Sequence, residues 1–189
     1  GKDLAKIERI VAPYKNNPKV KLLGVEPDAN YNRTVVTILG DPEEVKKAVI
    51  ESIGIATKEI DMNVHKGEHK RMGATDVVPF LPIQEMTTEE CNEISREVAK
   101  AVWEQFQLPV FLYESTATAP NRVSLPDIRK GEYEGMAEKL KQPEWAPDFG
   151  ERAPHPTAGV TAIGCRMPLI AFNINLATTN MDIPKEIAK

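Results

Sequence analysis

The strongest secondary-structure signal lies in residues Arg33 to Ile60, which read RTVVTILGDPEEVKKAVIESIGIATKEI. The part before Gly40 is rich in β-branched residues, which is typical of a β-strand. Asp41 then fits an N-cap, and Pro42 and two glutamates fit the first helical turn. Apolar residues follow at helical spacing as far as Ile60. The stretch therefore predicts a strand followed directly by an amphipathic helix.

Further elements are expected on both sides of this stretch. Before it, the pattern predicts a helix over residues 3–12 that Pro13 ends, a strand over Lys19–Val25 and a turn over Pro27–Asn32. After it, we expect a polar loop over residues 61–76, a strand over Val77–Ile83 and a helix that opens with a Thr87–Glu90 capping box. A strand over Pro109–Tyr113, one or two short helices over residues 126–141 and an irregular Pro-rich stretch over Pro143–Pro156 should follow. The chain should then form strands over Val160–Cys165 and Leu169–Leu176 and a helical turn from Asp182 to Lys189.

The order of these elements indicates the fold class. The order α-β-β-α-β, completed by one strand before residue 1, is the split βαββαβ pattern of ferredoxin-like folds. Extra α and β elements follow at the C-terminal side. We therefore predict an α+β sandwich whose mixed sheet carries helices on one face. A doubly wound parallel sheet is the weaker alternative, because strict βα alternation and a Gly-rich first turn are both missing.

Composition narrows the class of function. The 189 residues carry 24 Lys and Arg against 28 Asp and Glu, a formal charge of -4. No basic run suggests a nucleic-acid partner, and no apolar stretch approaches the roughly 20 residues that a membrane helix needs. The N-terminus lacks the anatomy of a signal peptide. Cys91 and Cys165 are expected to be reduced, partly buried thiols, so we predict a cytoplasmic protein.

The segment from His65 to Gly73, HKGEHKRMG, is the strongest candidate for chemistry. It holds two of the three histidines in the chain among cations and glycines, without apolar periodicity. Cations around a histidine lower its pKa, which leaves a neutral imidazole available as a base. A solvated surface loop is the alternative interpretation. The i, i+4 spacing of His65 and His69 also matches a zinc site, but Gly67 and the position of the glutamate argue against it.

Two other segments are weaker candidates. The run from Trp145 to Gly150 continues through His155–Gly159 and combines aromatics, prolines and glycines. Such a loop suits a flat, partly apolar ligand, or it is a Pro-stiffened crossing loop. The turn from Asp28 to Thr34 is polar, which ordinary turn chemistry also explains.

These segments, in this order, resemble the formiminotransferase family, in its N-terminal subdomain. The His65–Gly73 segment is highly specific, and the resemblance covers essentially the whole chain. Its other parts are Asn32-Arg33-Thr34, Ile60-Asp61-Met62, Gly131-Glu132-Tyr133-Glu134, Trp145–Gly150 and Leu169–Leu176. The family's first strand is not found after Gly1. The resemblance implies a subdomain over residues 1–176 and, from residue 177 to 189, the start of a linker or helix toward a second subdomain.

The resemblance also implies roles for individual residues. The second histidine of the segment, His69, maps onto the catalytic base. Asp28, Asn32 and Arg71 are weaker candidates for substrate contacts, and Lys66, Lys70 and Arg71 as a group supply positive charge for carboxylates. The family is ferredoxin-like and commonly dimeric, and folate lies between two stacked subdomains. The folate-binding stretch maps onto Gly150, Glu151, Arg152, Ala153, Pro154, His155, Pro156, Thr157, Ala158 and Gly159.

The implied activity is a transferase reaction of one-carbon metabolism. A formimidoyl group would move from N-formimidoyl-L-glutamate to tetrahydrofolate, the cosubstrate, in the step that ends histidine degradation, without a metal. Three alternatives remain open at this stage: formyl transfer between 5-formyltetrahydrofolate and glutamate, a non-catalytic folate-binding or dimerisation module, and a metal hydrolase that uses His65 and His69. We expect residues 1–189 alone to be a poor catalyst, since half of the cleft would be missing.

Overall fold

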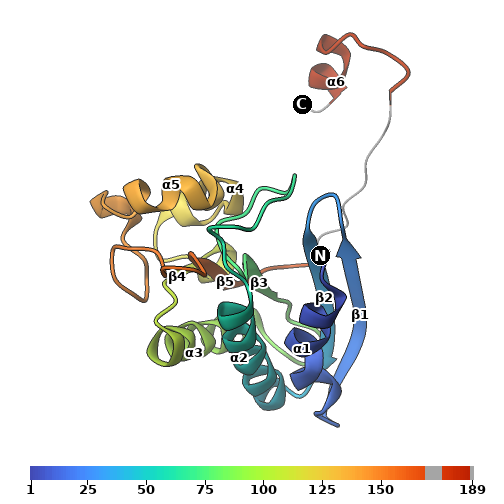
Figure 1. The fold of residues 1–189 in the computed structure, drawn as a ribbon, viewed down its shortest axis with the longest axis vertical. Helices are drawn as coiled ribbons and strands as arrows, with labels where there is room; N and C mark the ends of the chain where they lie inside the picture. The colour runs from blue at the N-terminus through green and yellow to red at the C-terminus, as the bar shows by residue number, and fades with distance from the viewer. Residues whose placement is uncertain (169–175, 188–189) are drawn as a thin grey trace.

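The computed structural model describes residues 1–168 and 176–187. Its strands form an antiparallel and a parallel group with helices packed against both, so the fold class is α+β as predicted (Figure 1). The described helices are α1 (Leu4–Lys15), α2 (Pro42–Glu59), α3 (Thr88–Phe106), α4 (Leu125–Arg129), α5 (Glu132–Lys139) and α6 (Asp182–Ile187), and the strands are β1 (Val20–Asp28), β2 (Arg33–Gly40), β3 (Val77–Phe80), β4 (Val110–Leu112) and β5 (Thr161–Cys165).

The described strands form two sheets, in contrast to the single mixed sheet of the ferredoxin-like expectation. β1 and β2 are an antiparallel hairpin whose register runs from Val20 opposite Gly40 to Asp28 opposite Arg33. β5 is the centre of a parallel sheet, with β3 on one side and β4 on the other. In the described part of the chain, β2 and β3 are therefore the facing edges of two separate sheets.

Helices cover the two sheets differently. α1 and α2 pack on one face of the hairpin, as expected for helices on one face. The parallel sheet departs from that expectation, because α3 packs on one face while α4 and α5 lie over the other (Figure 1). Since successive side chains of a strand alternate in direction, Leu112 and Ile163 join the apolar cluster with α1, α2 and α3, whereas Phe111 and Ala162 join the cluster beneath α4 and α5.

The predicted helix starts are confirmed, and one predicted helix end is wrong. The Asp41 carboxylate accepts from the backbone of Glu43 and Glu44, and Thr87 and Glu90 form the capping box. Pro13, by contrast, lies inside α1, which continues to Lys15. Proline removes only one backbone donor in this last turn, and Pro13 is buried in the core. The missing hydrogen bond is therefore offset by packing.

The observed limits of the strands differ from the predicted limits by a few residues. β1 extends through Pro27 to Asp28, because Pro27 lies on a hairpin strand that pairs on one side only among the described strands. β3 ends at Phe80, before Pro82. Helix α6 lies in the tail where a helical turn was predicted. The predicted strand Leu169–Leu176 and the boundary at residue 176 involve residues 169–175, outside the described residues.

Two further sequence expectations concern the core and the helices. Cys91 on α3 and Cys165 on β5 are both free and buried, as predicted. Burial, together with the neighbouring Cys165, raises the pKa of the Cys91 thiol to about 12, so this thiol stays protonated. None of the described helices has the length and the apolar character needed to cross a bilayer.

Candidate active site

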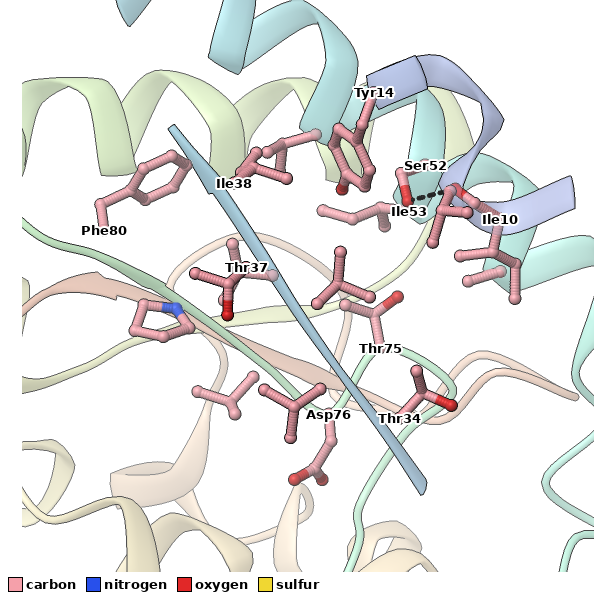
Figure 2. A pocket seen from close by; sticks show the side chains of 18 of the residues that line it. Ile10, Tyr14, Thr34, Thr37, Ile38, Ser52, Ile53, Thr75, Asp76 and Phe80 are labelled. Carbon is pink, nitrogen blue, oxygen red and sulfur yellow. Dashed lines mark hydrogen bonds between the residues drawn. The ribbon is translucent and has the colours of Figure 1, made fainter. Parts of the chain in front are cut away.

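A cavity of about 1780 Å³ opens between the facing edges of β2 and β3, and both His65 and His69 line it. One part of its wall is apolar, where Ile38 and Phe80 lie near the α1 and α2 side chains Tyr14 and Ile53 (Figure 2). The other part is polar and carries Thr34, Thr75 and Asp76. The cavity therefore combines an apolar wall with a polar end that contains imidazoles.

The loop that carries both histidines is fixed to the turn between β1 and β2. The side-chain amide of Asn32, a residue with φ 48°, donates to the carbonyl of Lys66 at 2.7 Å. Gly67 allows this close approach, because a Cβ there would lie 2.2 Å from the carbonyl oxygen of Tyr31. Any larger residue at position 67 would therefore collide with the Tyr31 carbonyl. The loop is held in one place relative to β2.

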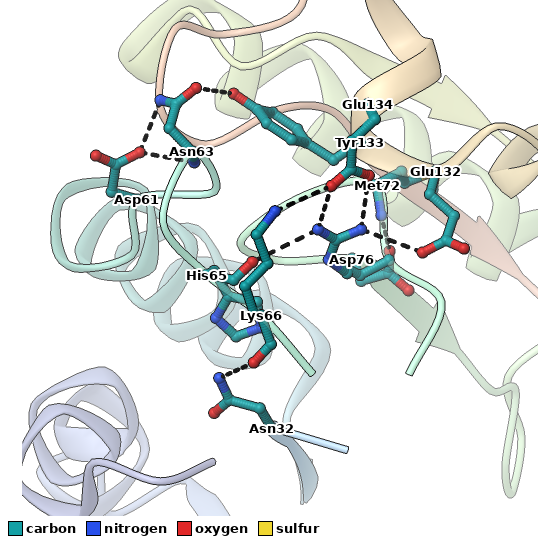
Figure 3. Close-up of polar contacts among 11 residues, drawn as sticks. Asn32, Asp61, Asn63, His65, Lys66, Met72, Asp76, Glu132, Tyr133 and Glu134 are labelled. Carbon is teal, nitrogen blue, oxygen red and sulfur yellow. Dashed lines mark hydrogen bonds and ion pairs between the residues drawn. The ribbon is translucent and has the colours of Figure 1, made fainter. Parts of the chain in front are cut away.

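The start of α5 clamps the same loop from the other side (Figure 3). Arg71 donates to both carboxylate oxygens of Glu134, at 2.7 and 2.8 Å, and to Glu132 at 3.1 Å. The backbone N–H of Tyr133 donates to the Arg71 carbonyl, and the Tyr133 hydroxyl donates to the side chain of Asn63. The ion pair with Arg71 lowers the pKa of Glu134 to about 2. The clamp is therefore ionic at every physiological pH.

The expected folate-binding stretch lies directly beside the histidine loop. Met62 donates its backbone N–H to the carbonyl of Thr157 at 2.7 Å, and Ala74 donates to Ala158 at 2.9 Å. Gly159 has a φ of +73°, and a Cβ there would lie 2.3 Å from the Met72 carbonyl oxygen. Two segments that are far apart in sequence are thus joined by backbone hydrogen bonds.

His69 sits among aromatic and cationic groups. Its ring meets the Tyr31 ring edge to face, with centroids 6.2 Å apart, and the Arg33 guanidinium lies 5.4 Å from the Tyr31 centroid. Burial lowers the pKa of His69, the charges of Arg33 and Arg129 lower it further, and Asp76 opposes them. The imidazole is therefore neutral at neutral pH, the state that a general base requires.

The other two histidines differ from His69. Burial, followed by the charge of Arg71, lowers the pKa of His65. In the 155–159 turn, Nδ1 of His155 accepts from the backbone N–H groups of Ala158 at 3.0 Å and Thr157 at 3.2 Å. The lone pair of that nitrogen is therefore in use, and the neutral ring carries its proton on Nε2. In this tautomer His155 is a hydrogen-bond donor toward a ligand and not a base.

Several residues predicted as contacts are held by the protein itself. Asp28 accepts from the Tyr31 backbone at 2.9 Å, which is turn chemistry, and Asn32 holds the histidine loop. Arg71 is buried against two carboxylates. Glu151, Arg152 and Ala153 are exposed at the loop tip. Trp145 packs edge to face on Phe111 in the second core cluster, so this aromatic is a scaffold residue.

The structure adds polar residues that sequence reasoning missed. Asp76 accepts from the Met72 backbone at 2.8 Å and pairs with Arg129 at 2.5 Å. Tyr133 and Asn63 connect α5 to the histidine loop. The partners are 53 and 70 residues apart in sequence, and no periodicity or motif relates them. The family-like Gly131–Glu134 run was the only signal that pointed toward Tyr133.

Metal ligation finds no support in this geometry. Among residues 1–168 and 176–187, no group of three or more His, Cys, Asp or Glu side chains is arranged to hold a metal ion. The pair His65 and His69 therefore lacks a third ligand of these types within the described chain.

Comparison with known proteins gives the family. Residues 1–166 match the family model described as the formiminotransferase domain, N-terminal subdomain. The chain belongs to the formiminotransferase family. It is 51% identical over 189 residues to the glutamate formimidoyltransferase of Streptococcus pyogenes serotype M1, a match that covers all of this chain and 63% of that protein.

More distant formiminotransferases share the same region. The chain is 41% identical over 190 residues to the glutamate formimidoyltransferase of Thermoplasma acidophilum, covering 62% of that protein. It is 44% identical over 173 residues to the formimidoyltransferase-cyclodeaminase of Mus musculus, which covers 92% of this chain and 32% of that protein. The chain thus spans about a third to two thirds of the length of these curated relatives.

Proposed function

We propose that the protein transfers a formimidoyl group from N-formimidoyl-L-glutamate to tetrahydrofolate, as its family and the names of its relatives suggest. The observation that carries the proposal is the juxtaposition of two segments. The loop of His69, whose imidazole is neutral, is hydrogen-bonded at both of its ends, through Met62 and Ala74, to the stretch that ends at Gly159. A proton acceptor and a loop long enough to line a ligand are thereby held in fixed positions relative to each other. A reaction between two substrates needs such fixed positions.

The proposed chemistry is an acyl-type transfer with His69 as general base. Nitrogen N5 of the pterin attacks the carbon of the protonated formimidoyl group, whose C=N electron pair moves to the formimidoyl nitrogen, while the imidazole of His69 takes the N5 proton, so no charged intermediate forms on N5. The tetrahedral intermediate then re-forms the C=N bond and breaks its bond to the glutamate nitrogen. The imidazolium returns the proton to that nitrogen, and glutamate leaves as a neutral amine. His69 ends the cycle neutral, as it began.

Other residues are assigned supporting roles. We assign the Gly150–Gly159 stretch to folate binding, with the Nε2–H of His155 as a fixed donor. Asn32 and Arg71 act as positioning residues, because their polar atoms already hold the histidine loop. Asp28 has a similar local role at the β1–β2 turn. The loop is thus held so that His69 meets its substrate in one orientation.

The proposal includes partners beyond this chain. The relatives are longer, so we infer a second α/β subdomain that covers the folate from the other side. The outer face of the β1–β2 hairpin carries the exposed apolar side chains Leu23, Val35 and Leu39, a surface suited to such a contact. A homodimer, as is common in the family, completes the proposed assembly.

The test is turnover by a full-length protein that contains this chain. Substitution His69→Ala should lower kcat by roughly 10²–10⁴ while folate affinity changes little, since the base acts mainly in the transition state. His65→Ala should be milder, and Lys100→Ala, at an exposed position of α3, is the control. A His69→Ala protein with near-normal kcat would show that the base is elsewhere.

The same assay separates the two possible donors. Wild-type protein is given N-formimidoyl-L-glutamate with tetrahydrofolate, and in parallel 5-formyltetrahydrofolate with glutamate. We expect turnover with the formimidoyl donor. Turnover confined to the formyl pair would replace the proposed substrate, and the absence of both reactions beside intact folate binding would favour a binding module.

A further inference from the structure

Two arginines that line the cavity have unused hydrogen-bonding capacity. Arg129 on α4 and Arg166, which follows β5, line the same cavity as His69. The Nε–H of each is buried without a hydrogen-bond partner among the described residues, as is that of Arg71. A buried donor without a partner is costly, so an acceptor that a ligand brings beside these guanidinium groups would stabilise them.

Asp76 fixes one of these arginines in place. One of its carboxylate oxygens accepts from the Met72 backbone at 2.8 Å, and the other pairs with Arg129 at 2.5 Å. Asp76 therefore ties α4 to the end of the histidine loop. The backbone N–H of Arg166 donates to the carbonyl of Phe80 at 2.9 Å, which anchors the second arginine to β3.

The charges that act on His69 do not balance. Arg33 and Arg129 lower its pKa, and the carboxylate of Asp76 opposes them. The charges of Arg166, Arg129 and Glu114 all act on the hydroxyl of Tyr113. Of these three residues, Glu114 is exposed and does not line the cavity. By contrast, the charges of Arg71 and Lys66 are already offset by Glu132 and Glu134. The net positive charge around His69 therefore comes from Arg33 and Arg129, and not from the histidine loop.

We propose that Arg129 and Arg166 form a binding site for a carboxylate of the acidic group donor, in the cavity that His69 lines. This inference rests on the proposed function and names the subsite that would hold the donor. A guanidinium fork matches a carboxylate with two parallel hydrogen bonds, which a lysine cannot reproduce. Neither arginine touches the reacting atoms, so both are binding residues.

The position beside His69 decides which carboxylate is bound. In N-formimidoyl-glutamate the α-carboxylate is only a few bonds from the carbon that is attacked. In a folate, the glutamate carboxylates are separated from N5 by the whole aminobenzoyl group. Arg129 is tied through Asp76 to Met72, three residues after His69, so a carboxylate that it binds fits the donor and not the folate tail.

The first experiment measures binding without chemistry. Glutarate, a dicarboxylate that carries no transferable group, is titrated calorimetrically into the full-length protein. We expect binding by the wild type and at least tenfold weaker binding by Arg166→Gln and by Arg129→Gln. Arg166→Lys, which keeps the charge and loses the fork, should fall between, and this variant also controls for folding defects. Arg96→Gln, on the outer face of α3 and paired with Glu89 and Glu93, is the matched control.

Unchanged glutarate affinity in Arg166→Gln, or no binding by the wild type, would overturn the site. The second experiment is transfer kinetics, where Arg166→Gln should raise KM for N-formimidoyl-L-glutamate about tenfold or more and leave KM for tetrahydrofolate unchanged. A rise confined to the folate KM would overturn the assignment to the donor. A wild-type protein without any transfer activity would refute the proposed function alone, because the glutarate titration still decides the site.

Discussion

At the scale of single residues, the three histidines have three different electrostatic environments. His155 uses its Nδ1 lone pair in a turn, His65 lies against the Arg71 clamp, and His69 lies between Arg33 and Arg129. His65 and His69 both combine a lowered pKa with a position in the cavity wall, but the cation beside His65 is paired with two glutamates. The cations that lower the pKa of His69 would also attract the acidic substrate of the proposed reaction.

This arrangement predicts a shift in the pH dependence of turnover. Substitution Arg33→Gln removes a positive charge that lowers the pKa of His69, so that pKa should rise. Because the base works in its neutral form, the acidic limb of the kcat profile should move to higher pH, by less than about one unit for a partly solvated charge. The measurement is kcat from pH 5 to pH 8, with Lys100→Gln on α3 as control. An acidic limb that stays in place would separate Arg33 from the base.

Sequence reasoning proposed the segments of the candidate site and not the contacts between them. The histidine loop was singled out because clustered histidines and glycines are visible locally, and the Gly150–Gly159 stretch was assigned through the family resemblance. The Asp76–Arg129 pair was invisible, because a single ion pair across 53 residues has no pattern. Arg71 was expected to be a free cation, but tertiary structure places Glu132 and Glu134 against it.

At the scale of elements, α5 acts as a clamp on the histidine loop. The helix starts at Glu132, after Gly131 with φ 94°, and presents Tyr133 and Glu134 to the loop. The starts of α2 and α3 were predictable from the sequence, since the capping residues Asp41 and Thr87 act locally. The pairing of the strands was not predictable, because strand partners depend on the path of the whole chain.

The clamp predicts a pH-dependent loss of stability in Glu134→Gln. Glu134 has a folded-state pKa of about 2, below its ordinary value of 4.5, so the ion pair stabilises the fold above pH 4.5 and is lost as the pH falls toward 2. The substitution should lower the free energy of unfolding by about 1 kcal/mol at pH 7, since solvent screens a half-exposed carboxylate. Urea unfolding at pH 7 and pH 3 should show the difference shrinking at the lower pH. Glu138→Gln, in an exposed pair with Lys141, should show no comparable effect, and a constant difference would contradict the clamp.

At the scale of the whole molecule, the cavity separates two sheets whose edges face each other. β2 and β3 both line it, and each lacks a partner on that side among the described strands. The ferredoxin-like order places one central strand between these two edges. Gly1 lies beside the start of β2, since its nitrogen is 2.7 Å from the carbonyl oxygen of Asp28, the residue paired with Arg33. A segment joined to Gly1 would run antiparallel along β2 toward Gly40.

We therefore expect an extended segment of seven residues, joined to Gly1, to pair with β2 and stabilise the protein. Apolar residues at alternate positions would face Val36 and Ile38, which pack against the core, and each buried side chain contributes about 1.5–3 kcal/mol. The midpoint of urea unfolding should rise, and amide exchange in β2 and β3 should slow, since unpaired edge groups gain partners. The matched control carries the same composition with a proline at the fourth position, which cannot complete the ladder. Equal unfolding midpoints for the two extended proteins would show that the cavity does not accept a strand, and the ferredoxin-like order would then fail for this chain.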